Sequence, residues 1–277
     1  MKRNEENRFE RIALVLAGRR KDEADLFAET ENVSHKALLE AGGEPLIRRV
    51  TNALTHSGRF SRIDIAAPEE IRAEITIALA GLSGWTFSDA LGSPAATVCA
   101  AIEKLTERQG LVVTTSDHAL LQAEIIGEFL DAAANCDAAA ACVEKARYQA
   151  RFPGSRRTFI HLRGFQFSGA NLFWFHGARA RGLADFWRRL ETKRKNPAEM
   201  AREIGLSTAL AYALRLMTKS GLEKAIEKRT GVAAKLIALT NAEAAIDVDK
   251  PEDLTLVRSI LDEKAITAAR EKNREAN

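Results

Sequence analysis

The sequence has little cysteine. Its three cysteines, Cys99, Cys136 and Cys142, form no Cys-x-x-Cys pair and stand close to alanines. We expect them to be small buried apolar residues in a reducing compartment, which indicates a cytoplasmic location. A disulfide framework is therefore excluded, and a chain of 277 residues buries enough apolar surface to be stable without one.

Long hydrophobic runs are also missing. No stretch approaches the ~20 apolar residues that a membrane-spanning helix requires. The first apolar run, from Ile12 to Ala17, is too short for the core of a signal peptide and is soon followed by Arg19, Arg20 and Lys21. We therefore expect neither a membrane span nor a targeting segment.

An excess of charge of one sign is absent as well. Lys and Arg number 41 and Asp and Glu number 38, so the net charge of +3 is too small to indicate a nucleic-acid partner. The apolar fraction of 46% and the charged fraction of 29% are typical of a soluble globular protein. We expect one domain over residues 1–277, with a core at about 11–261 and an inserted helical segment at about 178–230.

Several motifs that carry known chemistry are lacking too. No Gly-x-x-x-x-Gly-Lys-Ser/Thr run exists, which excludes a P-loop NTPase. No Gly-x-Gly-x-x-Gly follows the first apolar run, which makes a dinucleotide-binding dehydrogenase an unfavourable interpretation. The five histidines show no His-Glu-x-x-His spacing, so zinc or iron is not indicated.

What the first half does contain is a regular alternation of short apolar runs and amphipathic segments. Strands are predicted at 12–17, 62–66, 85–87 and 111–115, and helices at 45–57, 69–80, 94–107 and 122–134. Four strand–helix units in a row predict an α/β fold with a mostly parallel, doubly wound sheet between two layers of helices, related to the Rossmann architecture.

The second half is less regular. Strands are predicted at 138–147, 158–162 and 169–175, forming a small β excursion over the main sheet with a turn at Pro153-Gly154. Apolar residues at helical spacing around Phe186 and Trp187 predict a helix, and further helices are expected over 198–228. Short strands at 236–239 and 245–249 and a final helix from Pro251 complete the chain.

Polar residues follow three of the predicted strands, at the sheet edge where open α/β sheets bind ligands. The first group is Leu16-Ala17-Gly18. A glycine directly after a buried strand allows close approach of a ligand, and its backbone amides can hold phosphate oxygens. Arg20 and Lys36 would add positive charge, although a solvated basic loop is an equally good interpretation.

Carboxylates form the other two groups. Asp117 follows a buried strand, where a carboxylate is costly unless it is paired, binds a metal or caps the next helix. Asp247 and Asp249 lie two residues apart, so on a strand they would face one side and could reach one cation, unless one of them caps the final helix. Asp117 and Asp249 fit Mg²⁺, which takes few protein carboxylates and completes its shell with phosphates and water.

Four segments, taken together and in order, resemble a known family. The chain is similar to the nucleotidyltransferases with a GT-A-like fold, and nearest to the molybdenum-cofactor-transferase-like NTP transferases. The similarity spans residues 11 to about 261. The matching segments are Leu16-Ala17-Gly18 with Lys36 and Gly43-Glu44-Pro45-Leu46, then Ser116-Asp117-His118, then Gly169-Ala170-Asn171-Leu172-Phe173, and Asp249 to Leu254.

The resemblance implies an enzyme that transfers an NMP from an NTP, with CTP or GTP favoured, to a small phosphorylated or anionic acceptor and releases pyrophosphate. Mg²⁺ would be the cofactor, held by Asp117 and Asp249, with Asp247 as a further possibility. Catalytic roles fall on Lys36, Asp117 and Asp249. Nucleotide contacts are assigned to Leu16, Ala17, Gly18, Arg20, Lys36, Gly92, Ser93, Thr97 and Asp117, and acceptor contacts to Arg151, Gly169 and Asn171.

The opening segment departs from the family pattern, which is usually Leu-Ala-Gly-Gly-x-Gly-x-Arg-Met. Arg19 stands where the second glycine is expected, no Arg-Met pair follows, and Lys36 comes after a longer loop. The base, the acceptor and the role of Arg20 are therefore left open by the sequence.

Two other functions are kept as alternatives. Asp247-Val248-Asp249 is an Asp-x-Asp motif, as GT-A glycosyltransferases use to hold a metal and a nucleotide sugar, but those enzymes carry it mid-chain. A non-catalytic nucleic-acid-binding protein is suggested by Arg188-Arg189 and by Lys193-Arg194-Lys195. Those charges are expected on the polar side of an amphipathic helix, which favours a solvated face.

Overall fold

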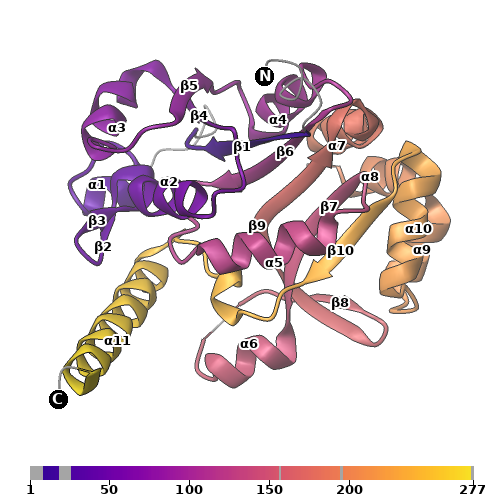
Figure 1. The fold of residues 1–277 in the computed structure, drawn as a ribbon. Coiled ribbons are helices and arrows are strands. Elements are labelled where there is room, and N and C mark those ends of the chain that lie inside the picture. The colour runs from indigo at the N-terminus through magenta and orange to yellow at the C-terminus, as the bar shows by residue number, and fades with distance from the viewer. Residues whose placement is uncertain (1–8, 19–25, 156, 194–195, 276–277) are drawn as a thin grey trace.

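A computed structural model shows an α/β protein built on one mixed sheet (Figure 1). The structure describes residues 9–18, 26–155, 157–193 and 196–275. The sheet order is β10-β7-β9-β6-β1-β4-β5, and a short strand, β8, pairs with β9 alone. The strands are β1 (Glu10–Leu16), β4 (Arg62–Ala67), β5 (Trp85–Asp89), β6 (Gln109–Thr115), β7 (Ala138–Glu144), β8 (Ile160–Leu162), β9 (Phe165–His176) and β10 (Ala234–Ala238).

Helices cover both faces of this sheet, which confirms the expected three-layer α/β/α arrangement. One face carries α2 (Leu46–His56), α3 (Arg72–Ala78) and α5 (Ala123–Ala133). The other carries α4 (Pro94–Glu103), α7 (Arg181–Thr192) and α10 (Lys219–Thr230). The remaining helices are α1 (Leu26–Thr30), α6 (Lys145–Arg151), α8 (Pro197–Ile204), α9 (Leu206–Ala213) and α11 (Pro251–Glu275). A small hairpin of β2 (Glu40–Ala41) and β3 (Glu44–Pro45) stands apart.

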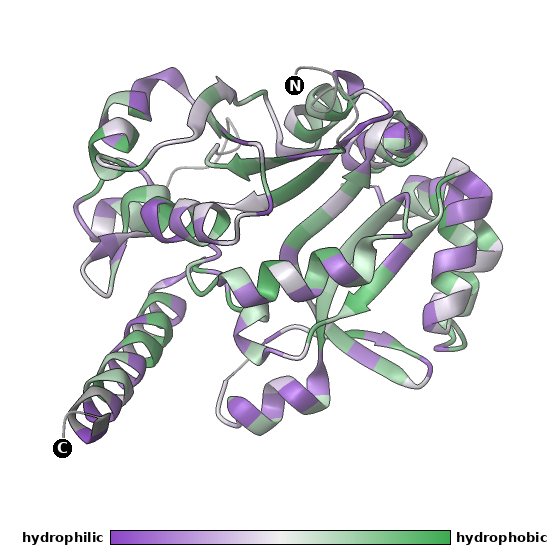
Figure 2. Ribbon diagram, in the orientation of Figure 1, coloured by the Kyte–Doolittle hydropathy of each residue, from purple (hydrophilic) through white to green (hydrophobic). Residues whose placement is uncertain are grey.

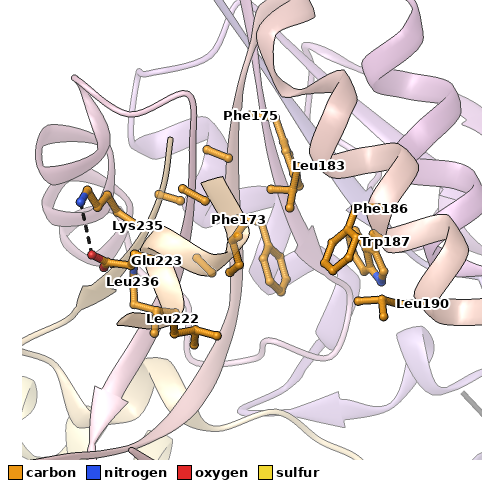
Figure 3. A pocket seen from close by; sticks show the side chains of 15 residues that line it. Phe173, Phe175, Leu183, Phe186, Trp187, Leu190, Leu222, Glu223, Lys235 and Leu236 are labelled. Atoms are coloured by element: carbon orange, nitrogen blue, oxygen red, sulfur yellow. Dashed lines mark hydrogen bonds and ion pairs between the residues drawn. The ribbon is translucent and has the colours of Figure 1, made fainter. Parts of the chain in front are cut away.

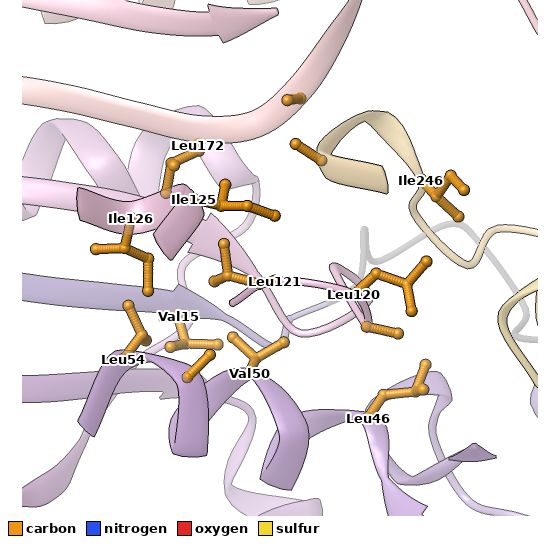
Figure 4. Close-up of a cluster of buried hydrophobic side chains, with 14 of the residues drawn as sticks. Val15, Leu46, Val50, Leu54, Leu120, Leu121, Ile125, Ile126, Leu172 and Ile246 are labelled. Carbon is orange, nitrogen blue, oxygen red and sulfur yellow. The ribbon is translucent and has the colours of Figure 1, made fainter. Parts of the chain in front are cut away.

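The central strand β1 explains why the sheet is buried on both sides. Val15 packs with Val50 and Leu54 of α2 in one core (Figure 4), whereas Leu14 packs with Val98 of α4 in the other. Successive side chains of a strand point to opposite faces, so a continuous apolar run supplies both cores. The apolar strands appear green in Figure 2, while the helices mix green with purple, because each helix buries only one face.

The predicted β excursion belongs to the main sheet. β9 lies antiparallel between β6 and β7, and only β8 extends beyond the sheet as one arm of a hairpin. The prediction of a strand as far as Arg147 is wrong, because β7 ends at Glu144 and α6 begins at Lys145. The sequence Lys-Ala-Arg-Tyr-Gln-Ala-Arg is rich in good helix formers, which explains the switch.

The prediction of a strand at 245–249 is also wrong. A 3₁₀ turn covers Ala242–Ala245 and an irregular segment continues to residue 250. This segment crosses the end of β6 instead of pairing along it, because the Val248 amide donates to the carbonyl of Asp117 at 3.0 Å. Asp247 and Asp249 therefore do not share a strand face.

The helices between β9 and β10 leave an apolar cavity of about 240 Å³ against the sheet (Figure 3). Phe173 and Phe175 of β9 face Phe186 and Trp187 of α7 across it. It lies near the amino ends of β7 and β10, away from the carboxyl ends of β1 and β6. Among the described residues, no helix is both long and apolar enough to cross a membrane.

Two glycines provide a test of this packing. A methyl group on Gly110 of β6 would lie 2.0 Å from the Trp174 ring, whereas on Gly127 of α5 it would meet only Arg59 Nη2 at 3.7 Å. We expect Gly110→Ala to lower the free energy of unfolding by about 2 kcal/mol or more through overpacking. Gly127→Ala should raise it by about 0.5–1 kcal/mol, since alanine favours the helix. Urea unfolding measures both, and equal midpoints for Gly110→Ala and the unchanged protein would contradict the packing of Trp174.

Candidate active site

The carboxyl ends of β1 and β6 lie side by side and in register. Leu16 is paired with Thr115, and the Ser116 amide donates to the Leu16 carbonyl at 3.0 Å. Gly18 and Asp117, each two residues further on, are therefore brought to the same edge of the sheet. Asp117 is 4% exposed, and its carboxylate accepts a short hydrogen bond from the Thr115 hydroxyl.

Lys36 reaches this edge from a separate loop. It begins a 3₁₀ turn, Lys36–Leu38, which the buried His35 caps by accepting from the Ala37 amide through Nδ1 at 3.1 Å. From there Lys36 Nζ donates to Asp117 Oδ2 in a short contact and to Asp249 Oδ1 at 3.2 Å. Three residues far apart in the sequence thus meet at one ammonium group.

Asp249 lies in the irregular segment that follows Ala245, where the sequence analysis predicted a strand at 245–249. The Val248–Asp117 backbone bond anchors the segment, and Asp253 Oδ2 accepts from the amides of Asp249 and Lys250 at 3.2 Å each. These bonds fix the start of α11 and turn the Asp249 side chain, which is 63% exposed, toward Lys36. One buried and one exposed carboxylate therefore converge on the same cation.

The charge of Lys36 is strongly held. Burial by itself lowers the pKa of its ammonium, but the carboxylates of Asp117 and Asp249 outweigh burial and raise the pKa above its usual value. A raised lysine pKa means that the stabilising charge is fully present below the unfolded value of about 10.4 and is lost only above it. Lys36 is therefore a permanent cation at physiological pH.

The two carboxylates are also suitable for a divalent metal. They present hard oxygen ligands to a single cation, here the Lys36 ammonium. Within the described ranges, no third His, Cys, Asp or Glu completes a metal cluster with them. This donor set fits Mg²⁺, which is bound by one or two carboxylates together with phosphate oxygens and water.

The residues predicted to hold the nucleotide gather beside Gly18. Leu16, Gly18, Ser93 and Thr97 line one small pocket, and a methyl group on Gly18 would come within 3.1 Å of the Ala90 side chain. The buried Ala17 continues the sheet by donating its amide to the Ala66 carbonyl at 2.9 Å, while Gly92 has open space beside it. Arg20 lies outside the residues that the structure describes.

Ser93 and Thr97 also have structural roles. Ser93 caps α4 by accepting from the Ala96 amide at 3.1 Å, and its hydroxyl donates to Glu191 of α7 at 2.6 Å. Thr97 accepts from the Leu91 amide at 2.9 Å, which fixes the loop before α4. A larger cavity of about 550 Å³ begins at this loop and is lined by Ser34, His35, Pro68, Glu69, Glu70, Ile71, Glu74, Ala90 and Leu91.

On the other side of the carboxylates lies a second polar cluster. β9 runs antiparallel to β6 with Leu172 opposite Thr114, so Asn171 sits at the carboxyl end of β6. A bulge between β7 and β9 falls at the same place and re-aims the strand. Asn171 Nδ2 then donates to Asp247 Oδ2 at 3.1 Å.

Arg157, which the sequence analysis did not single out, completes this cluster. Its guanidinium donates to Asp247 Oδ1 and to the Ser168 hydroxyl, both at 2.6 Å. Asp247 therefore has partners different from those of Asp249. The only sequence signal for Arg157 is its place after the Pro153-Gly154 turn, before a predicted strand.

The other two predicted acceptor residues lie differently. Gly169 is exposed on β9 with open space beside its Cα. Arg151 is the last residue of α6, and its guanidinium pairs with Glu263 of α11 at 3.1 Å. The structure thus joins Arg151 to the final helix and leaves Asn171 beside Asp247.

The basic residues of α7 are largely paired with acids. Arg188 donates to Glu103 at 2.7 Å, and Arg189 and Lys193 share Glu203 at 2.6 and 2.5 Å. Arg194 and Lys195 lie outside the described residues. Among the described residues, these basic side chains of α7 and its C-cap are therefore engaged in ion pairs within the protein.

Comparison with known proteins decides the family. A sequence model of the MobA-like NTP transferase domain matches residues 14–232, which is most of the chain. The protein belongs to the MobA-like NTP transferase family. It is therefore a nucleotidyltransferase, an enzyme that takes a nucleotide as substrate. A comparison with curated proteins finds no match.

Solved structures agree with this MobA-like fold. A hypothetical transferase from Thermus thermophilus is 27% identical with a TM-score of 0.73, over 88% of this chain and 99% of that one. A 4-diphosphocytidyl-2C-methyl-D-erythritol synthase from Anaerococcus prevotii is 9% identical with a TM-score of 0.58, over 91% and 98% of the two chains. Another synthase of that name is 14% identical with a TM-score of 0.54, over the same shares. The two synthases support the fold alone.

Proposed function

We propose that the protein is an Mg²⁺-dependent nucleotidyltransferase that moves an NMP from an NTP to a small anionic acceptor and releases pyrophosphate. The observation that carries this proposal is the convergence of Lys36, Asp117 and Asp249, from three separate segments, at the carboxyl edge of the sheet. Such a transfer depends on positioning and charge neutralisation more than on covalent chemistry.

Asp117 and Asp249 are the residues that would hold Mg²⁺. When bound, the ion neutralises phosphate charge and orients the nucleotide and the acceptor. The buried Asp117, held by Thr115, supplies a fixed ligand, while the exposed Asp249 faces the open side from which a nucleotide would enter. Lys36 would share these carboxylates and present its ammonium to the phosphates.

Lys36 is suited to stabilise charge on the leaving pyrophosphate. Its ammonium is permanently protonated, because both carboxylates raise its pKa. A cation positioned before the reaction lowers the energy of negative charge that grows on the oxygen between the α- and β-phosphorus atoms. Gly18 and the neighbouring backbone would lie against the phosphates, since no side chain intervenes at that position.

The acceptor side favours a ligand with negative charge. Arg157 presents a planar guanidinium that suits phosphate or carboxylate oxygens, and Asn171 can both donate to and accept from a hydroxyl. Both hold Asp247, which is next but one to the metal-binding Asp249. A phosphorylated small molecule is therefore the proposed acceptor class.

The large cavity beside His35 would suit a base that carries an exocyclic amino group. Glu70 and Glu74 line it, and carboxylates accept hydrogen bonds from amino groups. Cytosine, guanine and adenine carry such a donor and uracil does not, so the preference for CTP or GTP within this set comes from the family resemblance alone. The three free cysteines also support a reducing compartment, as expected for a cytoplasmic enzyme.

The glycosyltransferase alternative is less well supported. Its Asp-x-Asp motif requires two carboxylates on one cation, but Asp247 is engaged by Arg157 whereas Asp249 meets Lys36. Turnover of a nucleotide sugar, with no pyrophosphate formed from NTPs, would favour that alternative.

A pyrophosphate-release screen tests the proposed function. The four NTPs are each incubated with the enzyme, Mg²⁺ and a panel of phosphorylated metabolites. We expect pyrophosphate with one acceptor class and a preference for CTP or GTP, and no turnover after chelation by EDTA. Equal release in EDTA would contradict the role of the metal.

Asn171→Ala tests the acceptor side. Losing one hydrogen-bonding group should raise the acceptor KM by about five- to tenfold without changing NTP affinity. Gln166→Ala is the matched control, because it removes an exposed amide from the same strand. Equal loss of NTP affinity in Asn171→Ala would place this residue on the nucleotide side, and unchanged kinetics would make it structural.

A further inference from the structure

The helix α9 and the turn that follows it expose an unusual amount of apolar surface. Nine large hydrophobic side chains are exposed among the described residues, and five of them lie within residues 206–216. We call these five the α9 surface: Leu206, Leu210, Tyr212, Leu214 and Leu216. α9 has no buried residue of its own. A cluster of exposed apolar groups of this kind marks an interaction site.

The geometry of the α9 surface is well defined. Leu206, Leu210 and Leu214 follow one another at intervals of four, which places them in one stripe along the helix. The turn is closed by the amides of Leu216 and Met217, which donate to the Ala211 carbonyl at 2.8 and 3.1 Å. The stripe is therefore presented outward by an ordered backbone.

The segment that carries this apolar stripe has basic residues but no acidic ones. No acidic residue occurs between Glu203 and Glu223, a stretch that includes Arg215 and Lys219. Arg163, at the turn between β8 and β9, is exposed and donates its amide to the Met217 carbonyl at 2.7 Å. In Figure 1 this hairpin points toward the end of α9.

We propose that the α9 surface docks the protein on an anionic lipid bilayer. The leucines of the stripe would enter the boundary between headgroups and acyl chains, and the exposed Arg163 and Arg215 would meet lipid phosphates. Lys219, whose ammonium lies over the Phe165 ring at 5.2 Å, would add positive charge beside them. Charge argues against a second copy of the chain, because a two-fold contact would bring the same cations together. A helix of 8 residues lies on a membrane and does not cross it.

Vesicle co-sedimentation of the full chain tests this proposal. Vesicles of phosphatidylcholine alone are compared with vesicles that also contain phosphatidylglycerol, at low and high salt. We expect binding only to the anionic vesicles and weaker binding in high salt, since the electrostatic part is screened. The double variant Leu210→Glu, Leu214→Glu should reduce partitioning by roughly tenfold or more. The variant Arg215→Gln, Lys219→Gln should reduce it as well, and should remove most of its salt dependence.

Ile77→Glu is the matched control. Ile77 is 76% exposed, more than any residue of the α9 surface, but lies alone on α3. This variant should bind anionic vesicles like the unchanged protein, and circular dichroism should show all variants folded. Absence of binding, or equal binding by the Leu210→Glu, Leu214→Glu variant, would overturn the proposal. A concentration-dependent dimer in sedimentation velocity that this variant abolishes would assign the surface to a second copy instead.

Discussion

Replacing Asp117 by asparagine is expected to lower kcat by about a hundredfold or more while leaving the protein folded. Asparagine keeps the shape of the side chain and its place beside Thr115, but removes the charge that binds Lys36 and would bind Mg²⁺. Asp249→Asn should produce a loss of the same order, since its carboxylate reaches the same ammonium. The measurement is pyrophosphate release at saturating NTP and acceptor, repeated over a range of Mg²⁺ concentrations.

Two further variants distinguish the metal site from a general effect of charge removal. Asp131→Asn breaks an exposed ion pair with Arg59 at 2.8 Å, far from the strand ends, and should leave kcat unchanged. Asp247→Asn should act mainly on the acceptor KM, because Asp247 is held by Arg157 and Asn171 and does not contact Lys36. Near-normal activity of Asp117→Asn and Asp249→Asn in limiting Mg²⁺ would remove the proposed metal site.

The second large effect is expected for Lys36→Met. Methionine keeps much of the side-chain volume but removes the ammonium from the two carboxylates. If the contact between lysine and phosphate tightens as charge develops, kcat should fall by about a hundredfold while NTP affinity falls much less. Steady-state kinetics combined with equilibrium NTP binding separates the two quantities. Lys104→Met, at the exposed end of α4, is the matched control.

The pH profile adds an independent check on Lys36. Because the carboxylates raise the pKa of its ammonium, Lys36 should stay protonated between roughly pH 6 and 10. Any alkaline loss of activity of the unchanged enzyme should therefore persist at the same pH in Lys36→Arg.

Unchanged turnover of Lys36→Met with only weaker NTP binding would contradict the catalytic role and make Lys36 a docking residue.

Local sequence signals were sufficient for the four strand–helix units in the first half of the fold. The apolar run of β1 had to be a strand covered on both faces, because it is too short for a buried helix and has no polar face. Ser93 followed by Pro94 marks the start of α4, where a hydroxyl caps the helix and proline suits its first turn. These are effects between neighbouring residues, so they can be inferred without knowing the tertiary structure.

The family similarity was sufficient to choose Lys36, Asp117 and Asp249 as candidates, and its position after a strand supported Asp117. Both kinds of argument place residues at the carboxyl edge of a parallel sheet, where ligands bind. They could not show that the three side chains meet at one ammonium. That depends on the Val248–Asp117 bond, which joins residues 131 positions apart in the chain (248 − 117).

The sequence by itself determined the alternating α/β plan, the buried strands and the types of residue available at the sheet edge, because periodicity and capping are local. Only the tertiary structure decided that residues 245–249 are irregular, that Asp247 faces Arg157 and Asn171, and that β9 enters the sheet between β6 and β7. Each of these choices depends on long-range backbone pairing and on charges from distant segments. Such pairings compete with local propensity and are settled only when the elements pack together.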